Sequence, residues 1–330
     1  MIYLLLISVL VSFLLTVLML PKWIKKCRSI GLVWEDMNKF GHPKNVASSG
    51  GVVVVLAFAL GVLSYVALKT FVFGGTVKAL EIFSLLCVIF ILGIVGLTDD
   101  LLGWKNQGLS IKIRLLFAFM ASIPLVVINA GTHIVDLPFI GLIDFGILYP
   151  LVLIPVGIAG AATTYNFLAG FNGLEAGQGI LIVSFLSYVA YVSGSPWLAI
   201  IGLCMVSTLI GFYFFNKFPT DVFPGDIMTY AVGALIAGMA ILGNFEKIAL
   251  IVFIPYIIEV VLKLRGKLSV NSFGVPDKYG KLKQPYDKIY GLEHLAIKIL
   301  NKFGGATERK VVYLIHVFQL LFILIAFLMM

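Results

Sequence analysis

Residues 80–97 read LEIFSLLCVIFILGIVGL, and Glu81 is the one charged residue among them. An α-helix needs about 20 predominantly apolar residues to cross the hydrocarbon core of a bilayer, so this stretch predicts a membrane-spanning helix. The whole chain has the same character, because 61% of its 330 residues are hydrophobic and 12% are charged. A soluble domain carries about 25% charged residues. The composition therefore predicts an all-α integral membrane protein whose surplus apolar surface faces lipid.

Other apolar runs of similar length extend this prediction to a single polytopic domain that covers residues 1–330, with about ten spanning helices. The predicted spans are residues 2–20, 46–66, 80–97, 113–129, 145–163, 177–193, 197–215, 227–243, 247–263 and 311–330. Basic residues follow the first run instead of preceding it, which is the reverse of a cleavable signal peptide. We therefore expect a retained first helix.

Basic residues gather in alternate connections between the predicted spans. If the segment after the first span is cytoplasmic, 21 of the 24 lysine and arginine residues lie inside. The positive-inside rule then places both termini outside, and the formal charge of +8 reflects topology, not nucleic-acid binding. The long inner segment 264–310 is predicted as a cytoplasmic loop. Within it, Leu292, Leu295 and Ile299 predict a short amphipathic helix on the membrane surface.

Five polar clusters lie in different connections, and this topology brings all five to the cytoplasmic face. They are Glu35–Lys39, Asp99–Asp100, Asn166–Glu175, Asp221–Asp226 and the surroundings of His294. Acids, amides and bases on one membrane face suit a divalent metal that bridges a diphosphate while lysines neutralise the remaining charge. A lipid phosphate would reach the same depth as a second substrate. The three cysteines lie far apart and favour neither zinc nor a disulfide framework.

The acid pair Asp99–Asp100 closes the third predicted span. The helix macrodipole disfavours each acid at a helix C-terminus by about 0.3–1 kcal/mol. We therefore expect a compensating cation, either a metal ion or one of Lys112 and Arg114. The alternative is a solvated pair in a loop.

The other clusters each allow a structural and a functional interpretation. Asn166, Asn172 and Glu175 offer the hard oxygens that Mg²⁺ prefers, but a Gly/Asn turn would use the same residues. Asp226 is a candidate N-cap of the next span, and its helix N-terminus would also favour an anion.

Two further residues are equally ambiguous. Phe223 is either packing or a stacking face. A lone His294 is more often structural than catalytic.

In this order, the motifs resemble the polyprenyl-phosphate N-acetylhexosamine-1-phosphate transferase family, and most of all its branch that acts on UDP-N-acetylglucosamine and dolichyl phosphate. The matching strings are DMNK at 36–39, GLTDD at 96–100, NFLAGFNGLEAGQ at 166–178 and FPGD at 223–226. The bacterial branch that uses a muramyl-pentapeptide has aspartates where this chain has Ala169 and Asn172, which argues against that substrate.

The resemblance implies transfer of a sugar phosphate from a UDP-sugar to a polyprenyl or dolichyl phosphate, with release of UMP. It also implies that Asn166 and Asp226 hold Mg²⁺, with Mn²⁺ as an alternative, and that Asn172 binds uracil while Phe223 stacks on it. Asp99, Asp100 and Arg114, or Lys112 in its place, would act at the metal diphosphate. The remaining residues expected at the substrates are Glu35, Asp36, Asn38, Lys39, Gly173, Glu175 and His294.

Several alternatives stay open. Another UDP-acetamido sugar is the nearest, because YGLEHLAIK at 290–298 departs from the histidine-rich motif of the family's last inner loop. A transporter is the alternative of another class, although transporters usually bind near the bilayer midplane. A prenyl-chain synthase is disfavoured, because DDLLG lacks a further aspartate. We expect an archaeal plasma membrane, or the endoplasmic reticulum in a eukaryote, and leave a homodimer as an open alternative to a monomer.

Overall fold

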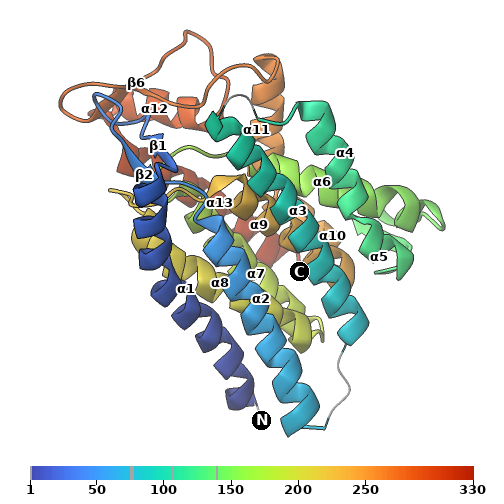
Figure 1. Cartoon of the computed structure of the whole chain (residues 1–330). Helices are drawn as coiled ribbons and strands as arrows, with labels where there is room; N and C mark the ends of the chain where they lie inside the picture. Colours follow the sequence, from blue (N-terminus) through green and yellow to red (C-terminus); the bar gives the residue numbers. More distant parts are fainter. Residues whose placement is uncertain (1, 75–77, 106–107, 139) are drawn as a thin grey trace.

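The computed structural model describes residues 2–74, 78–105, 108–138 and 140–330. Among these residues, seven helices are long and apolar enough to cross a membrane, and they form a bundle in Figure 1. The prediction of an all-α membrane protein is thus confirmed. The seven are α1 (Ile2–Ile30), α2 continued by η1 (Gly51–Ala67 and Leu68–Val72), α3 (Ala79–Lys105), α7 (Leu174–Val192), α8 (Pro196–Asn216), α9 (Gly225–Gly243) and α13 (Glu308–Leu328).

Two of the three other predicted spans are interrupted helices: α4 with α5 (Ile111–Ala121 and Ile123–Val127) and α10 with α11 (Glu246–Val252 and Ile254–Arg265). The third is one shorter helix, Tyr149–Tyr165, in which η2 (Tyr149–Leu153) continues directly into α6 (Ile154–Tyr165). Pro124 and Pro255 stand in the first turn of α5 and α11, and proline lacks the backbone N–H that a continuous helix requires, which explains both interruptions. Pro155 stands where η2 changes into α6 without a break.

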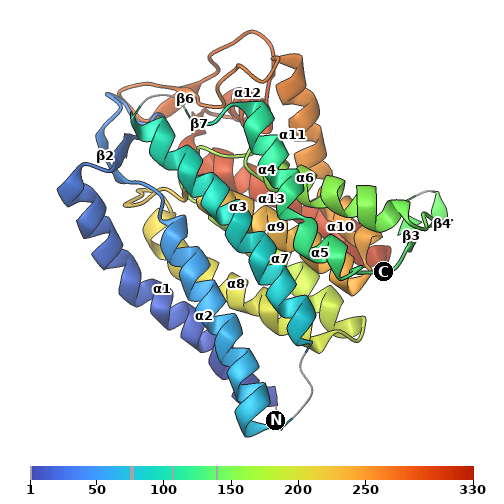
Figure 2. The same ribbon diagram turned by 45° about the vertical axis from the view of Figure 1, so that its right-hand side comes forward.

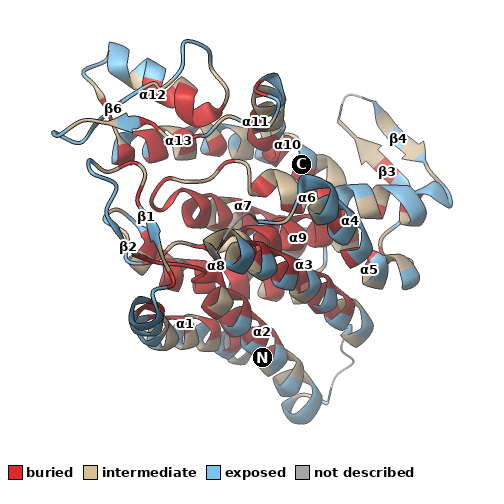
Figure 3. Cartoon of the chain, turned by 45° about the horizontal axis from the view of Figure 1, so that its top comes forward, coloured by how far each residue is buried: buried red, intermediate tan, exposed pale blue. Residues whose placement is uncertain are grey.

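Helix α9 forms the centre of the bundle. In its most apolar window 83% of the residues are buried, against 28% in α1 and α13, and Figure 3 shows it largely in the colour of buried residues. Close backbone contacts hold it there. A side chain on Gly96 of α3 would begin 2.5 Å from the carbonyl carbon of Asp226, and one on Gly233 would begin 2.6 Å from the oxygen of Ala161. Small residues allow such an approach between helices in a membrane.

Two helices run further than the apolar pattern predicts. Helix α1 continues past Pro21 to Ile30, and α3 continues to Lys105. Asp99 and Asp100 therefore lie inside α3, before its last turn, and the expectation that they end this helix is wrong. The contacts that make this position tolerable are described below.

Short strands and helix α12 gather at one end of the bundle (Figure 1). The hairpin of β3 and β4 (Ile134–Leu137 and Gly141–Asp144) projects elsewhere, as Figure 2 shows. The strands at the shared end are β1 (Val33–Glu35) paired with β2 (Lys44–Ala47), and β5 (Val275–Pro276), β6 (Lys281–Lys283) and β7 (Ala306–Thr307) in one sheet.

The segment 264–310 contains the predicted short helix, α12 (Leu292–Lys302). Its buried face differs from the prediction, however. Ile299 is 39% exposed, whereas the residues that pack inward are Leu292, Glu293, His294, Ala296 and Ile297. This helix packs on α13, so its inward face contacts protein.

Candidate functional site

Two adjoining cavities lie where α3, α9, β1 and the 166–173 connection meet. We call the first, of about 330 Å³, the aspartate cavity, and the second, of about 530 Å³, the loop cavity. They share Trp34, Asp100 and Asp226. The aspartate cavity is also lined by Asp99, Gly103, Gly108, Leu109 and Arg114. The loop cavity is also lined by Glu35, Asp36, Asn166, Gly170, Glu175, Phe223, Thr229 and Phe273, among others.

Asp99 is compensated by a cation, as its sequence context predicts. Its Oδ2 lies 3.0 Å from an Arg114 guanidinium nitrogen, and its Oδ1 accepts a hydrogen bond from the backbone N–H of Leu109. Arg114 also lies 3.7 Å from Asp226. Arg114 is thus the basic residue of the aspartate cavity, whereas Lys112 is exposed and lines neither cavity.

Asp100 is compensated by the start of another helix. Its Oδ1 accepts a hydrogen bond of 2.8 Å from the backbone N–H of Asp226, and its Oδ2 accepts one of 3.1 Å from the Ser49 hydroxyl. A carboxylate is stabilised by the free N–H groups and the dipole at a helix N-terminus. The expected capping of α9 by Asp226 is therefore wrong: this helix has no side-chain cap of its own, and Asp100 binds its first turn.

Asn166 and Asp226 line the same loop cavity. The Thr229 hydroxyl, one turn after Asp226 in α9, donates a hydrogen bond of 3.1 Å to the side-chain oxygen of Asn166. Among the described residues, no three His, Cys, Asp or Glu side chains are grouped as a metal would require. Mg²⁺ is commonly held by one or two carboxylates together with substrate phosphates and water. The amide and carboxylate oxygens present therefore fit Mg²⁺ in a complex with a phosphate substrate.

The 166–173 connection is held from within by Glu175. This carboxylate is buried and accepts a hydrogen bond of 2.8 Å from the backbone N–H of Gly170. The Tyr165 hydroxyl donates to the backbone oxygen of Glu175 at 2.6 Å. Gly173 has a φ of +84° at the start of α7, a conformation that glycine adopts at little steric cost. Glu175 and Gly173 therefore shape the wall of the loop cavity.

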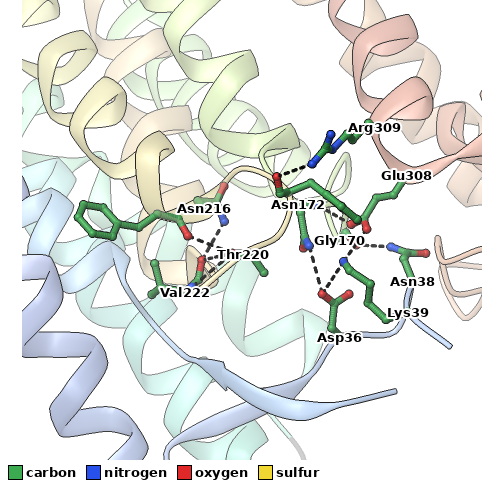
Figure 4. Close-up of polar contacts among 12 residues, drawn as sticks. Asp36, Asn38, Lys39, Gly170, Asn172, Asn216, Thr220, Val222, Glu308 and Arg309 are labelled. Atoms are coloured by element: carbon green, nitrogen blue, oxygen red, sulfur yellow. Dashed lines mark hydrogen bonds and ion pairs between the residues drawn. The ribbon is translucent and has the colours of Figure 1, made fainter. Parts of the chain in front are cut away.

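Residues 36–39 hold the same connection from outside (Figure 4). The Asn172 side chain donates to Asp36 at 3.1 Å, and the Lys39 ammonium contacts Asp36 at 2.8 Å and Glu308 at 2.7 Å. Glu308 also accepts from the backbone N–H of Asn172 at 2.9 Å. Asp36, Lys39, Asn172 and Glu308 thus form a closed ring, which we call the Glu308 ring.

Asn38 links the connection to the 264–310 segment. Its side-chain nitrogen donates to the backbone oxygen of Gly170 at 2.8 Å, and its oxygen accepts from the backbone N–H of Gly274 at 3.1 Å. Glu35 lines the loop cavity and lies 3.7 Å from Lys44 in an exposed pair. In the predicted cluster at 35–39, Glu35 and Asp36 therefore line the loop cavity, whereas Asn38 and Lys39 help to hold the 166–173 connection in place.

His294 lines neither cavity. It is fully buried and its ring meets Tyr286 edge to face at 5.5 Å. Burial lowers the pKa of this imidazole, which favours its neutral form. The position agrees with the structural interpretation of this histidine.

Sequence reasoning missed several residues that the structure places at the site. Glu308 is the most important, since it closes the ring from 269 positions away. Trp34, Ser49, Thr229 and Phe273 were missed as well. The available signal for Glu308 was modest: an acid in the first turn of the last apolar helix, where the macrodipole favours it.

Taken together, these features define an integral membrane protein with a polar cleft, lined by carboxylates and an amide, at one end of its helices. The chain belongs to glycosyl transferase family 4. That family's model matches residues 82–244, and relatives match nearly the full length.

A Saccharolobus solfataricus protein is 32% identical over 97% of this chain and 95% of its own length. It is named provisionally as a UDP-N-acetylglucosamine–dolichyl-phosphate N-acetylglucosaminephosphotransferase. A Dictyostelium discoideum protein with that name is 29% identical over 93% of this chain and 83% of its own. A phospho-N-acetylmuramoyl-pentapeptide-transferase of Halalkalibacterium halodurans is 28% identical over 82% of this chain and 84% of its own.

Proposed function

We propose that this protein transfers N-acetylglucosamine-1-phosphate from UDP-N-acetylglucosamine to a dolichyl or other polyprenyl phosphate. A lipid phosphate oxygen forms a bond to the β-phosphorus of the donor, the bond from that phosphorus to the bridging oxygen breaks, and UMP leaves. The observation that carries the proposal is one shared surface: Asp100, Asn166 and Asp226 line the loop cavity together with Phe223.

The two cavities suggest how the donor lies. Phe223 lines the loop cavity and offers its aromatic face to the uracil ring. Asn172 belongs to the 166–173 connection, which forms part of the lining of this cavity. The diphosphate then extends toward Asp100 and Asp226, which belong to both cavities. The acceptor phosphate approaches from the aspartate cavity, at the depth where a lipid headgroup lies.

Charge explains why a divalent cation belongs to this proposal. Three carboxylates and one guanidinium line the aspartate cavity, so a bound diphosphate would meet uncompensated negative charge. Asn166 and Asp226 would hold Mg²⁺, or Mn²⁺ in its place, which supplies charge neutralisation and polarises the β-phosphate. The attacking phosphate has a second pKa of about 6, so it is ionised near neutral pH and needs no strong base. Arg114 pairs with Asp99 and orients its carboxylate.

The proposal includes a topology. The seven long helices, the helix Tyr149–Tyr165 and the two interrupted ones would make ten crossings, with both termini outside and the cleft on the cytoplasmic face. The distribution of lysine and arginine supports this orientation. The membrane would be the plasma membrane of an archaeon, and the product would start a lipid-linked glycan.

The decisive test is UMP release by detergent-purified protein given UDP-N-acetylglucosamine, dolichyl phosphate and Mg²⁺. We expect release that depends on lipid and metal, and a loss of at least about 100-fold in Asp226→Ala. Activity with a different UDP-acetamido sugar would keep the reaction and replace the donor. A folded protein that releases no UMP from any UDP-sugar would refute the proposal and favour transport.

A further inference from the structure

The Glu308 ring joins three parts of the chain that are remote in sequence. Asp36 and Lys39 follow β1, Asn172 lies in the 166–173 connection, and Glu308 opens α13. The side chains of Glu308 and Asp36 are only 3% and 7% exposed. Hydrogen bonds to charged groups are stronger than those between neutral ones, and burial protects these from screening by water and salt.

We infer that Glu308 is a positioning residue for the nucleotide end of the donor site. It fixes the backbone of Asn172 with one oxygen and the Lys39 ammonium with the other, and Lys39 in turn fixes Asp36, which holds the Asn172 amide. The inference rests on the proposed function only in naming the nucleotide; the ring itself is defined by its hydrogen bonds and ion pairs.

The Lys39 ammonium is held by its neighbours within the Glu308 ring, which leaves it little freedom to bind a substrate phosphate. Its ammonium contacts two carboxylates at 2.7 and 2.8 Å and lies 4.3 Å from the centre of the Phe218 ring. Figure 4 shows it pointing inward between Asp36 and Glu308. Lys39 lines neither cavity, so it acts through the loop and not on a bound phosphate.

The chemistry of the ring requires a carboxylate at position 308. Two donors, the Asn172 N–H and the Lys39 ammonium, face its two oxygens. Glutamine has nearly the same shape but one acceptor oxygen and an NH₂ group. In Glu308→Gln, one of the two donors must therefore face another donor, and the ring opens on that side.

The first test needs no substrate. Hydrogen–deuterium exchange of peptides that cover 166–173 should be about tenfold faster in Glu308→Gln than in the unmodified protein. The matched control is Asp221→Asn, which removes the exposed pair with Arg28 and should leave exchange unchanged. Unchanged exchange in a folded Glu308→Gln would overturn the inference.

The second test separates positioning from chemistry. Glu308→Gln should raise KM for UDP-N-acetylglucosamine about tenfold while kcat stays within about twofold, and Lys39→Met should do the same. Because the residues share one ring, the double variant should cost less than the product of the single effects. A fall in kcat with KM unchanged would overturn the inference and make Glu308 a participant in the reaction.

Glu308→Asp covers the case in which Glu308→Gln does not fold. Aspartate keeps the negative charge, but its side chain is one methylene shorter. We therefore expect an exchange rate and a KM between those of the unmodified protein and those of Glu308→Gln. Values equal to those of the unmodified protein would overturn the inference. If the unmodified protein releases no UMP, the proposed function fails, and the exchange measurement still decides whether the ring holds the connection.

Discussion

At the scale of single residues, the acid pair shows how two adjacent carboxylates are compensated by different means. Asp99 meets the guanidinium of Arg114, and Asp100 meets the first turn of α9. The first partner could be predicted, because Arg114 follows by 15 positions, although Lys112 was an equal candidate. The second could not, since 126 positions separate Asp100 from Asp226, and a backbone donor leaves no mark in the sequence.

Arg114 and Lys112 can be distinguished by matched substitutions. We expect Arg114→Met to cost about 1–3 kcal/mol of stability, because it leaves Asp99 unpaired in a largely buried place, and to lower UMP release at least about tenfold. Lys112→Met should stay within about 0.5 kcal/mol, as exposed substitutions do. Thermal unfolding in detergent and UMP release measure both. Equal effects of the two substitutions would contradict the assignment.

At the scale of helices, apolar runs located the segments but not their ends or interruptions. Prolines were visible at 124, 155 and 255, yet a proline can also kink a continuous membrane helix, so the pattern alone did not require a break. The extension of α3 past Asp100 could not be predicted, because partners from other elements make it tolerable. Glycine spacing likewise gave no warning that α3 and α9 touch through their backbones.

Two glycines of α3 provide a paired test of that contact. Gly96→Ala would place a methyl group 2.5 Å from a backbone atom of Asp226, whereas Gly93→Ala would meet the side chains of Ile227 at 3.7 Å and Val55 at 3.9 Å, which are ordinary contact distances. We expect the first to cost about 1–3 kcal/mol through overpacking, and the second to be neutral or to stabilise by up to about 1 kcal/mol through helix propensity. Thermal unfolding compares them. Similar unfolding temperatures of the two variants would show that α3 and α9 move apart readily to accommodate the added methyl group.

We expect the free energy of unfolding to depend on pH through Glu293 of helix α12, because burial raises the pKa of this carboxyl well above its ordinary value of 4.5. Glu259, Lys263 and Glu175 act on this carboxyl electrostatically. The folded protein keeps a proton that the unfolded chain releases, so this contribution is fully present below pH 4.5 and is lost as the pH rises toward the folded pKa.

Glu293→Gln should therefore flatten the stability profile by up to about 1.4 kcal/mol per pH unit between about pH 5 and the raised pKa. Chemical unfolding at several pH values measures it. Glu81→Gln, at an exposed pair with Lys78, is the control and should leave the profile unchanged. If the free energy of unfolding of Glu293→Gln changes with pH as steeply as that of the unmodified protein, another group causes the pH dependence.

At the scale of the whole molecule, the sequence was most informative about which polar clusters lie together. Polar clusters from separate connections were expected on one face, and the structure brings Glu35, Asp100, Asn166 and Asp226 to one cavity. Their pairing was not predictable, because rings such as that of Glu308 depend on contacts between segments that are remote in the chain. The distribution of charged residues predicts on which face of the membrane a residue lies, but not which other residue it contacts.

Cysteine labelling tests the orientation. In a Cys87→Ser background, the remaining native cysteines, Cys27 and Cys204, are buried. Tyr279→Cys and Leu142→Cys replace side chains that are 76% and 75% exposed at opposite sides of the proposed membrane. A membrane-impermeant maleimide should modify position 279 only in inside-out vesicles and position 142 only in right-side-out ones. The reverse pattern would invert the topology.

The Glu308 ring also has a consequence for biosynthesis. Its contact between Lys39 and Glu308 joins residues 269 positions apart, and Glu308 opens the long helix α13. A ribosome must translate past codon 308, and α13 must enter the bilayer, before the ring can close. A nascent chain with only its early helices inserted therefore lacks the Glu308 ring, and the 166–173 connection is fastened only late in synthesis.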